Sequence, residues 1–166
     1  MMVRRLTPQE FQAVIPRLGE ILADAVNAGS GVSFMLPFTA ADGARFWSGV
    51  DPNARQVFAA FDGNAIAGVV MLDKAWAPNQ PHRGEISKML VHSSHRRRGV
   101  GKALLDALEQ SARQQGLTLL NFDTVQGSPA EAFYRSLGFT CIGYIPGYAY
   151  SPDGRLDGTA IFYKQL

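Results

Sequence analysis

The most informative stretch of the sequence is a basic turn that contains two glycines. A strand-like apolar segment, 88–91, is followed by His95-Arg-Arg-Arg-Gly-Val-Gly-Lys102, and from Gly99 onward the apolar residues recur at helical spacing. Glycine lets backbone N–H groups approach an anion, and the first N–H groups of a helix are free and lie at its positive end. Arginines and Lys102 would add charge-assisted hydrogen bonds. The segment therefore predicts a site for a pyrophosphate, with basic side chains available for a phosphorylated ribose.

Two common phosphate-binding loops are excluded by spacing. A Walker loop that ends at Lys102 would need glycine where Arg96 stands and serine or threonine where Ala103 stands. A dinucleotide fingerprint that starts at Gly99 would need glycine where Leu104 stands. A solvated basic turn or a nucleic-acid patch is the plainer alternative. The strand before the turn and the amphipathic helix after it favour the anion site.

The elements that must position this turn alternate in type. Thr7 and Glu10 form a capping-box pattern at the start of a helix that Gly29 ends, and Pro16 predicts a kink or a break within it. The period-2 and helical patterns predict strands at 3–6, 56–61, 65–72, 85–91, 117–124, 140–145 and 159–165, and helices at 8–28, 39–47, 100–115 and 129–137. Residues 146–156 are expected to form a loop. This order predicts an α+β (mixed α/β) domain.

Composition limits the class of protein. The chain has 166 residues, of which 46% are apolar and 18% charged, and a formal net charge of +2. We therefore expect one domain, 1–166, that is neither a general binder of nucleic acid nor embedded in a membrane. Cys141 is the only cysteine, so no internal disulfide forms, and the basic N-terminus lacks the apolar run of a secretory signal. These features predict a soluble cytoplasmic protein.

Two motifs resemble those of the GNAT N-acetyltransferases. Arg96-x-x-Gly99-x-Gly101 is similar to their acetyl-CoA signature, and Ala130-x-x-Phe-Tyr-x-x-x-Gly-Phe139 is similar to their second signature. The resemblance covers roughly residues 58–164. It implies an acyl-CoA N-acyltransferase fold, with a central, mostly antiparallel sheet flanked by about four helices. Within the superfamily, the segments 31–35, 122–134 and 146–156 look like the tabtoxin-resistance acetyltransferase group.

The resemblance also implies which residues hold acetyl-CoA as co-substrate. Backbone groups of the strand would bind pantetheine, and the amides of the following turn would bind the pyrophosphate. Many members carry asparagine seven residues before the signature tyrosine, whereas this chain has Gly127, followed by Ser128 as a substitute. The implied cofactor-binding residues are Met89, Leu90, Val91, Arg96, Arg97, Arg98, Gly99, Val100, Gly101, Lys102 and Ser128.

Three side chains are implied to take part in the chemistry. An amine must lose its proton before it attacks, and a carboxylate can accept that proton directly or through water. Glu85 and Asp123 match positions with base or substrate-binding roles in the tabtoxin-resistance group, and Tyr134 occupies the usual acid position. The plainer alternatives are an edge carboxylate for Glu85, a helix cap for Asp123 and a buried aromatic for Tyr134.

The predicted function is acetyl-CoA-dependent transfer of an acetyl group to the amine of a small molecule. An amino-acid-like compound or a β-lactam toxin is the favoured acceptor class, which would give antibiotic or toxin resistance. A non-catalytic acyl-CoA-binding regulatory module is the alternative. No metal is expected, because His92 and His95 lack further ligands, and a homodimer is left open. The candidates for lining an acceptor pocket are Phe34, Met35, Trp76 and Tyr148, although scattered aromatic residues are more often part of a core.

Overall fold

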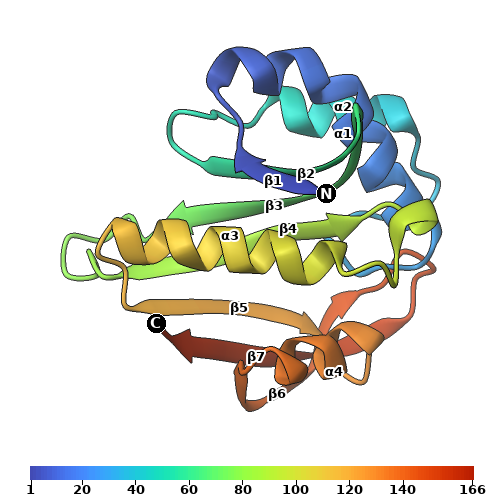
Figure 1. The fold of residues 1–166 in the computed structure, drawn as a ribbon. Coiled ribbons are helices and arrows are strands. Elements are labelled where there is room, and N and C mark those ends of the chain that lie inside the picture. The colour runs from blue at the N-terminus through green and yellow to red at the C-terminus, as the bar shows by residue number, and fades with distance from the viewer.

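A computed structural model describes all residues, 1–166, as a seven-stranded sheet with helices on both faces (Figure 1). The strands are β1 (Met2–Arg5), β2 (Gln56–Asp62), β3 (Ala65–Lys74), β4 (Arg83–Val91), β5 (Leu119–Val125), β6 (Thr140–Tyr150) and β7 (Leu156–Gln165). The helices are α1 (Pro8–Asn27), α2 (Ala40–Ser48), α3 (Val100–Gln114) and α4 (Pro129–Ser136), with a 3-10 turn η1 (Ser93–His95). Their order in the chain and the fold class are as predicted.

Local signals account for the helix starts. Thr7 Oγ1 accepts a hydrogen bond from Glu10 N–H, and the Glu10 carboxylate accepts one from Thr7 N–H, so the predicted capping box is present at the start of α1. Thr39 and Asp42 form a second capping box at α2. Pro16 does not break α1, which continues to Asn27.

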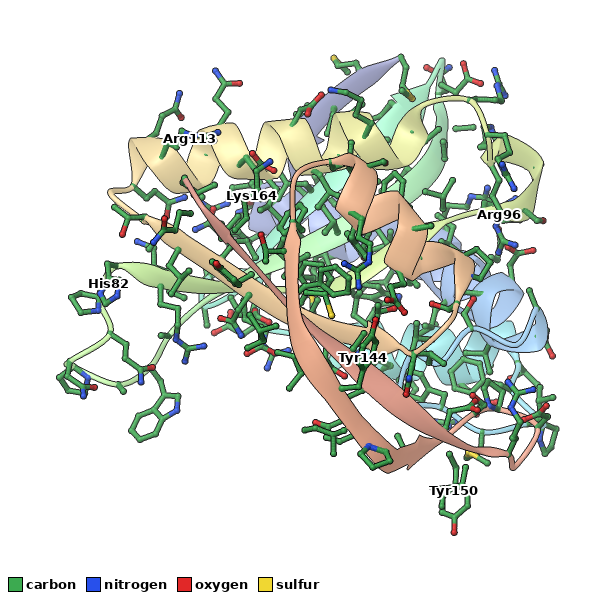
Figure 2. The ribbon with its side chains drawn as sticks, turned by 90° about the horizontal axis from the view of Figure 1, so that it is seen from below. His82, Arg96, Arg113, Tyr144, Tyr150 and Lys164 are labelled. Carbon is green, nitrogen blue, oxygen red and sulfur yellow. The ribbon has the colours of Figure 1, made fainter.

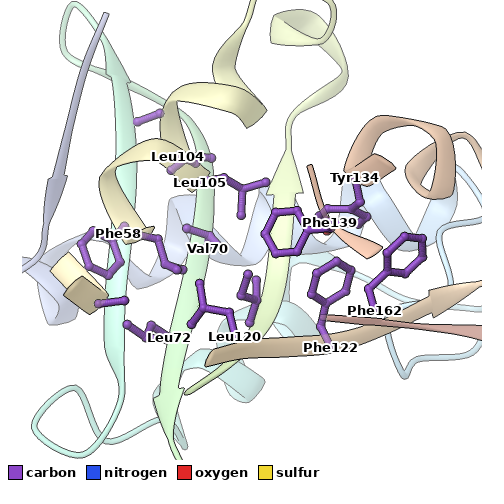
Figure 3. Packing of buried hydrophobic residues seen from close by; sticks show 14 of the residues in the cluster. Phe58, Val70, Leu72, Leu104, Leu105, Leu120, Phe122, Tyr134, Phe139 and Phe162 are labelled. Carbon is purple, nitrogen blue, oxygen red and sulfur yellow. The ribbon is translucent and has the colours of Figure 1, made fainter. Parts of the chain in front are cut away.

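The sheet separates two apolar cores. Helices α1 and α2 cover one face, over a cluster that includes Phe11 and Trp47. Helices α3 and α4 cover the other face, over a cluster in which Phe122, Tyr134 and Phe162 pack together (Figure 3). Strands β2, β3 and β4 place side chains into both cores, as expected from the alternation of side chains along a strand, whereas β5 and β7 contribute buried residues only to the core under α3 and α4.

The strand order is β1-β2-β3-β4-β5-β7-β6, and every neighbouring pair is antiparallel except β4 and β5. Those two strands are parallel, and they pair only over Arg83–Glu85 and Leu119–Asn121. Beyond Glu85 the edge of β4 that faces β5 has no strand partner. This parting of the sheet, called here the β4–β5 parting, lies directly before the basic turn.

The prediction that residues 146–156 form a loop is wrong. Strand β6 runs on to Tyr150 and β7 begins at Leu156, which leaves only a short turn at 151–155. Pro146 and Gly147 suggested a loop, but β6 is the outer strand of the sheet, where proline is tolerated, and its pairing with β7 shifts register between Ile145 and Ala149.

No helix in the structure is both long enough and apolar enough to span a bilayer.

Candidate active site

The basic turn presents a row of free backbone N–H groups. No backbone or side-chain acceptor in the protein takes the N–H groups of residues 97–102, whereas Ala103 N–H already bonds Gly99 O at 3.1 Å. Arg97 and Gly99 have positive φ angles of 59° and 77°, and Gly99 is the N-cap of α3 without a side-chain cap. Six consecutive donors at a helix start form an anion-binding arrangement.

Three of the basic side chains beside this turn are paired with carboxylates. The Arg96 side chain, labelled in Figure 2, donates to Val91 O at 3.1 Å and lies 3.4 Å from Asp24 of α1. Arg98 pairs with Asp62 at 2.9 Å, and Lys102 pairs with Asp106 at 2.6 Å. Arg97 forms no ion pair or side-chain hydrogen bond. The backbone is therefore the part of the turn that stands free for an anion, and the exposed ion pairs are weak enough to exchange.

Gly101 has a packing role that the sequence did not indicate. A Cβ at this position would lie 2.8 Å from Met89 Cε and 3.0 Å from Phe133 Cζ. The missing side chain lets the start of α3 approach both β4 and α4. In contrast, a Cβ at Gly99 would meet nothing within 4 Å.

Ser128 begins α4 with a buried hydroxyl that has no partner. Its Oγ makes no capping bond and no other hydrogen bond in the protein. The preceding residue, Gly127, has φ 73° and donates its N–H to Glu131 at 2.8 Å. Glu131 also accepts from the Tyr144 hydroxyl at 2.7 Å and from Arg135 at 2.9 Å. The bond from Gly127, followed by those from Tyr144 and Arg135, lowers the pKa of Glu131 to about 2.

Tyr134 lies in the aromatic cluster on the α3/α4 face, 4.2 Å from Phe122 between ring centroids (Figure 3). Burial raises the pKa of its phenol far above the ordinary value of 10.0. No protein group hydrogen-bonds the Tyr134 hydroxyl. The side chain therefore keeps its proton throughout the physiological pH range.

Glu85 and Asp123 lie on the opposite face of the sheet from Tyr134. Their neighbours Ile86 and Phe122 belong to the α3/α4-side cluster, so strand alternation points the two carboxylates toward the α1/α2 side. Asp123 accepts a hydrogen bond from Thr159 Oγ1 at 2.6 Å. Ser128, not Asp123, occupies the N-cap position of α4, so the helix-cap interpretation of Asp123 is wrong. Glu85 forms no hydrogen bond or ion pair.

Sequence reasoning missed a set of polar residues beside these two carboxylates. Glu85 pairs across the sheet with Asp73 of β3. Asp73 accepts a hydrogen bond from Ser87 at 2.9 Å and lies 3.5 Å from Arg55 Nε. Lys88 also lies in this cluster. No motif marks these residues, because they come from separate elements that only the sheet brings together.

The three segments that look like the tabtoxin-resistance group, 31–35, 122–134 and 146–156, lie close together in the structure. A Cβ on Gly31 would collide with Val125 at the end of β5, and Leu36 N–H donates to Pro152 O at 3.1 Å in the turn between β6 and β7. Phe34 and Met35 line a hollow of about 530 Å³. The other two candidates for the acceptor pocket, Trp76 and Tyr148, do not line this hollow, and Trp76 is 92% exposed.

Comparison with known proteins gives a consistent result. Residues 27–139 match the profile described as the acetyltransferase (GNAT) family. The chain is 34% identical over 91 residues to N-alpha-acetyltransferase 60 of Drosophila melanogaster, covering 50% of this chain and 33% of that protein. It is 28% identical over 99 residues to the uncharacterized N-acetyltransferase YsnE of Bacillus subtilis, covering 58% and 63%. The chain thus matches from a third to just under two thirds of the length of these relatives.

Solved structures share the fold over the whole chain. A ribosomal-protein-alanine N-acetyltransferase from Brucella melitensis superposes with a TM-score of 0.82 at 22% identity, covering 100% of both chains. The acetyltransferase yncA from Salmonella typhimurium, solved with its cofactor acetyl-CoA, superposes with a TM-score of 0.79 at 19% identity, covering 99% of this chain and 93% of that chain. At these identities the likeness shows the fold alone.

Proposed function

The chain belongs to the GNAT family of acetyltransferases, and on that basis we propose that it transfers the acetyl group of acetyl-CoA to the amine of a small molecule. The observation that carries this proposal is the row of six backbone N–H groups at 97–102, which has no acceptor within the protein. The row stands where β4 ends and α3 begins, beside the β4–β5 parting.

The residues present fit acetyl-CoA. The free N–H groups suit its pyrophosphate. The edge of β4 at Met89, Leu90 and Val91 has no strand partner and suits the amides of pantetheine, although Val91 O accepts a hydrogen bond from Arg96 in the free protein. Many family members contact pantetheine through an asparagine side chain. In this chain the buried Ser128 hydroxyl, which has no partner in the protein, can make that hydrogen bond instead. When bound, acetyl-CoA supplies the thioester from which the acetyl group is transferred.

Each polar side chain at the parting has a proposed task. Glu85 and Asp123 bind the acceptor's ammonium group and accept its proton, directly or through water. A backbone N–H of residues 89–91 polarises the thioester carbonyl. Tyr134 holds its proton and donates it to the departing sulfur. Its place on the opposite face from the carboxylates suits an acid and a base that act on the two sides of one reacting centre.

The acceptor is proposed to be a small amine with an amino-acid-like backbone. Support comes from the segment 31–36, which contacts the end of β5 and the 151–155 turn and so covers the acceptor side. A tabtoxinine-like lactam is one member of this class, and detoxification in the cytoplasm would then be the biological role. The competing acceptor is a protein N-terminus, since the names of two similar proteins refer to α-amino and ribosomal-protein acetylation.

One screen tests the proposed function. Purified protein is incubated with acetyl-CoA and pools of amino acids, lactams, polyamines, drugs and peptides, and release of free thiol is followed. We expect turnover with small amino-acid-like amines. Rapid reaction of peptides without reaction of small amines would overturn the acceptor class. Acetyl-CoA binding without turnover of any amine would instead favour the non-catalytic module.

A further inference from the structure

Lys88 occupies an unusual backbone position in β4. Val69 pairs with Leu90 and Met71 pairs with Ser87, so β4 carries one residue more than β3 across this interval. Lys88 lies in the resulting bulge with φ 47°, a left-handed conformation that side-chain-bearing residues rarely adopt. Bulges of this kind redirect a side chain, and strained positions of this kind occur at functional sites.

The redirected side chain ends among aromatic rings. Lys88 Nζ lies 5.3 Å from the ring centroid of Phe46 and 5.8 Å from that of Phe34. The Lys88 side chain is partly buried and forms no hydrogen bond or ion pair with any protein group. Aromatic faces attract a cation but offer no strong acceptor for its three N–H donors. The ammonium group is therefore held in place with its hydrogen-bonding capacity unused.

The charges around Lys88 are mixed. Its pKa is lowered by burial and by Arg55, while Asp73, Asp123 and Glu85 act in the opposite direction. These carboxylates do not lie close enough to form an ion pair with Lys88. Asp73 accepts a hydrogen bond from Ser87 through Oδ2, and its buried Oδ1 has no hydrogen bond but lies 3.5 Å from Arg55 Nε. Asp123 accepts a hydrogen bond from Thr159. A cation therefore stands beside the carboxylates that are proposed to receive the acceptor's amine.

This arrangement matches a molecule that carries both charges. We propose that Lys88 binds the carboxylate of the acceptor, so that the site selects amines bearing a carboxylate close to the reacting nitrogen. The inference rests on the proposed function and specifies its substrate class. The acceptor's ammonium group faces Glu85 and Asp123, and its carboxylate supplies the oxygen acceptors that Lys88 lacks in the free protein. An amine without a carboxylate would leave Lys88 unpaired.

The test compares matched acceptors and matched variants. Each amino acid of a panel is assayed beside the amine that lacks its carboxylate, such as histidine beside histamine and tryptophan beside tryptamine. The variants are Lys88→Met, which keeps the length without the charge, and Lys88→Arg, which keeps the charge. Thermal unfolding with and without acetyl-CoA shows whether each variant is folded and binds its co-substrate.

The wild type should prefer the carboxylate-bearing member of a reacting pair by at least about tenfold in kcat/KM, the order of one charge-assisted hydrogen bond. Lys88→Met should raise KM for that member about tenfold and leave the decarboxylated amine unaffected, and Lys88→Arg should retain most of the preference. Equal losses of kcat for both members would show that Lys88 acts on the proton instead and would overturn the proposal. Turnover of decarboxylated amines or peptides without preference for a carboxylate would also overturn it, while leaving the acetyltransferase assignment intact. If no amine of any class reacts, the proposed function falls as well.

Discussion

The free N–H groups before α3 can be tested with a matched pair of substitutions at Gly99. This residue has φ 77°, and a Cβ there would meet nothing within 4 Å. Asparagine and aspartate are the side-chain-bearing residues that best tolerate positive φ. Gly99→Asn and Gly99→Asp therefore differ by one negative charge at the start of the helix and by little else.

The charge has opposite effects on folding and on binding. An anion at a helix N-terminus stabilises the free protein by about 0.3–1 kcal/mol, so Gly99→Asp should unfold at or above the temperature of Gly99→Asn. Bound pyrophosphate would lie close to the same carboxylate. At a separation of about 6 Å, two unit charges repel by roughly 0.7 kcal/mol in water and about 2.8 kcal/mol at an effective dielectric constant of 20. The pyrophosphate carries about two negative charges, so the repulsion energy in water is about 1.4 kcal/mol. This energy corresponds to an acetyl-CoA affinity about tenfold lower for Gly99→Asp than for Gly99→Asn.

Thermal unfolding with acetyl-CoA, checked by calorimetric titration, measures both effects. A ligand at about 100 times its Kd stabilises the folded state by roughly 2.7 kcal/mol, which corresponds to about 5–11 °C for a domain of this size. At the same concentration a tenfold weaker complex gives roughly half that shift. The difference in acetyl-CoA affinity between Gly99→Asp and Gly99→Asn should become smaller at high salt, because salt screens exposed charges. Equal acetyl-CoA affinity in the two variants at low salt would refute the assignment of the turn.

Three further variants, at Tyr134, Glu131 and Ser128, have expected outcomes. Tyr134→Phe should lower kcat by ~10²-fold with acetyl-CoA affinity unchanged, and unchanged kcat where chemistry limits turnover would remove Tyr134 from the acid role. Because burial raises the pKa of Tyr134, wild-type stability should fall as pH rises above about 10, where the unfolded phenol ionises, and urea titrations should show a smaller fall in Tyr134→Phe. The pKa of Glu131 is lowered from 4.5 to about 2, so its contribution to stability is present above about pH 4.5 and is lost as pH falls toward 2. Between about pH 4.5 and pH 2, Glu131→Gln should lose less free energy of unfolding than wild type. If the free energy of unfolding falls equally with pH in both proteins, the three hydrogen bonds to Glu131 do not stabilise the fold. Ser128→Ala should leave the stability of the free protein unchanged or higher and weaken acetyl-CoA binding several-fold by titration, whereas unaltered binding would exclude a contact from this hydroxyl.

Local signals explain why so much of the fold could be predicted. The capping residues Thr7 and Thr39, the turn at residues 62–64 and the glycine that precedes α3 each act within a few residues of themselves. Their effect is therefore readable without knowledge of the rest of the chain. The extent of β6 was not readable in this way, because the pairing with β7 keeps Pro146 and Gly147 within a strand.

The candidate site was predictable only in part, for a related reason. The backbone of the glycine turn follows from its own residues, but the partners of its side chains come from distant segments. Arg96 turns to Asp24 and Arg98 turns to Asp62, which lie 72 and 36 positions away in the sequence. In the sequence, Lys88 is indistinguishable from an ordinary strand residue. Only the pairing of β3 with β4 shows that it lies in a bulge. Spacing rules contain no information about such contacts.

The distribution of unused hydrogen-bonding groups ties these observations together. Away from the β4–β5 parting, polar groups within the fold are paired: Gln56 with Gln115, and Glu109 with Lys164. Around the parting, the Ser128 and Tyr134 hydroxyls, the Lys88 ammonium group and the N–H groups of residues 97–102 have no partner in the protein. Only the Ser128 hydroxyl of this set is a buried side-chain atom without a hydrogen bond, together with Asp73 Oδ1 nearby, whereas residues 97–99 are exposed and water can reach their N–H groups. A buried polar group without a partner destabilises a fold, so a chain under selection for stability alone would pair or replace the Ser128 hydroxyl. The concentration of these unused groups at one place supports a ligand that completes them. The types of group suggest the ligand's parts: an anion for the N–H groups and an acyl acceptor held between opposite charges.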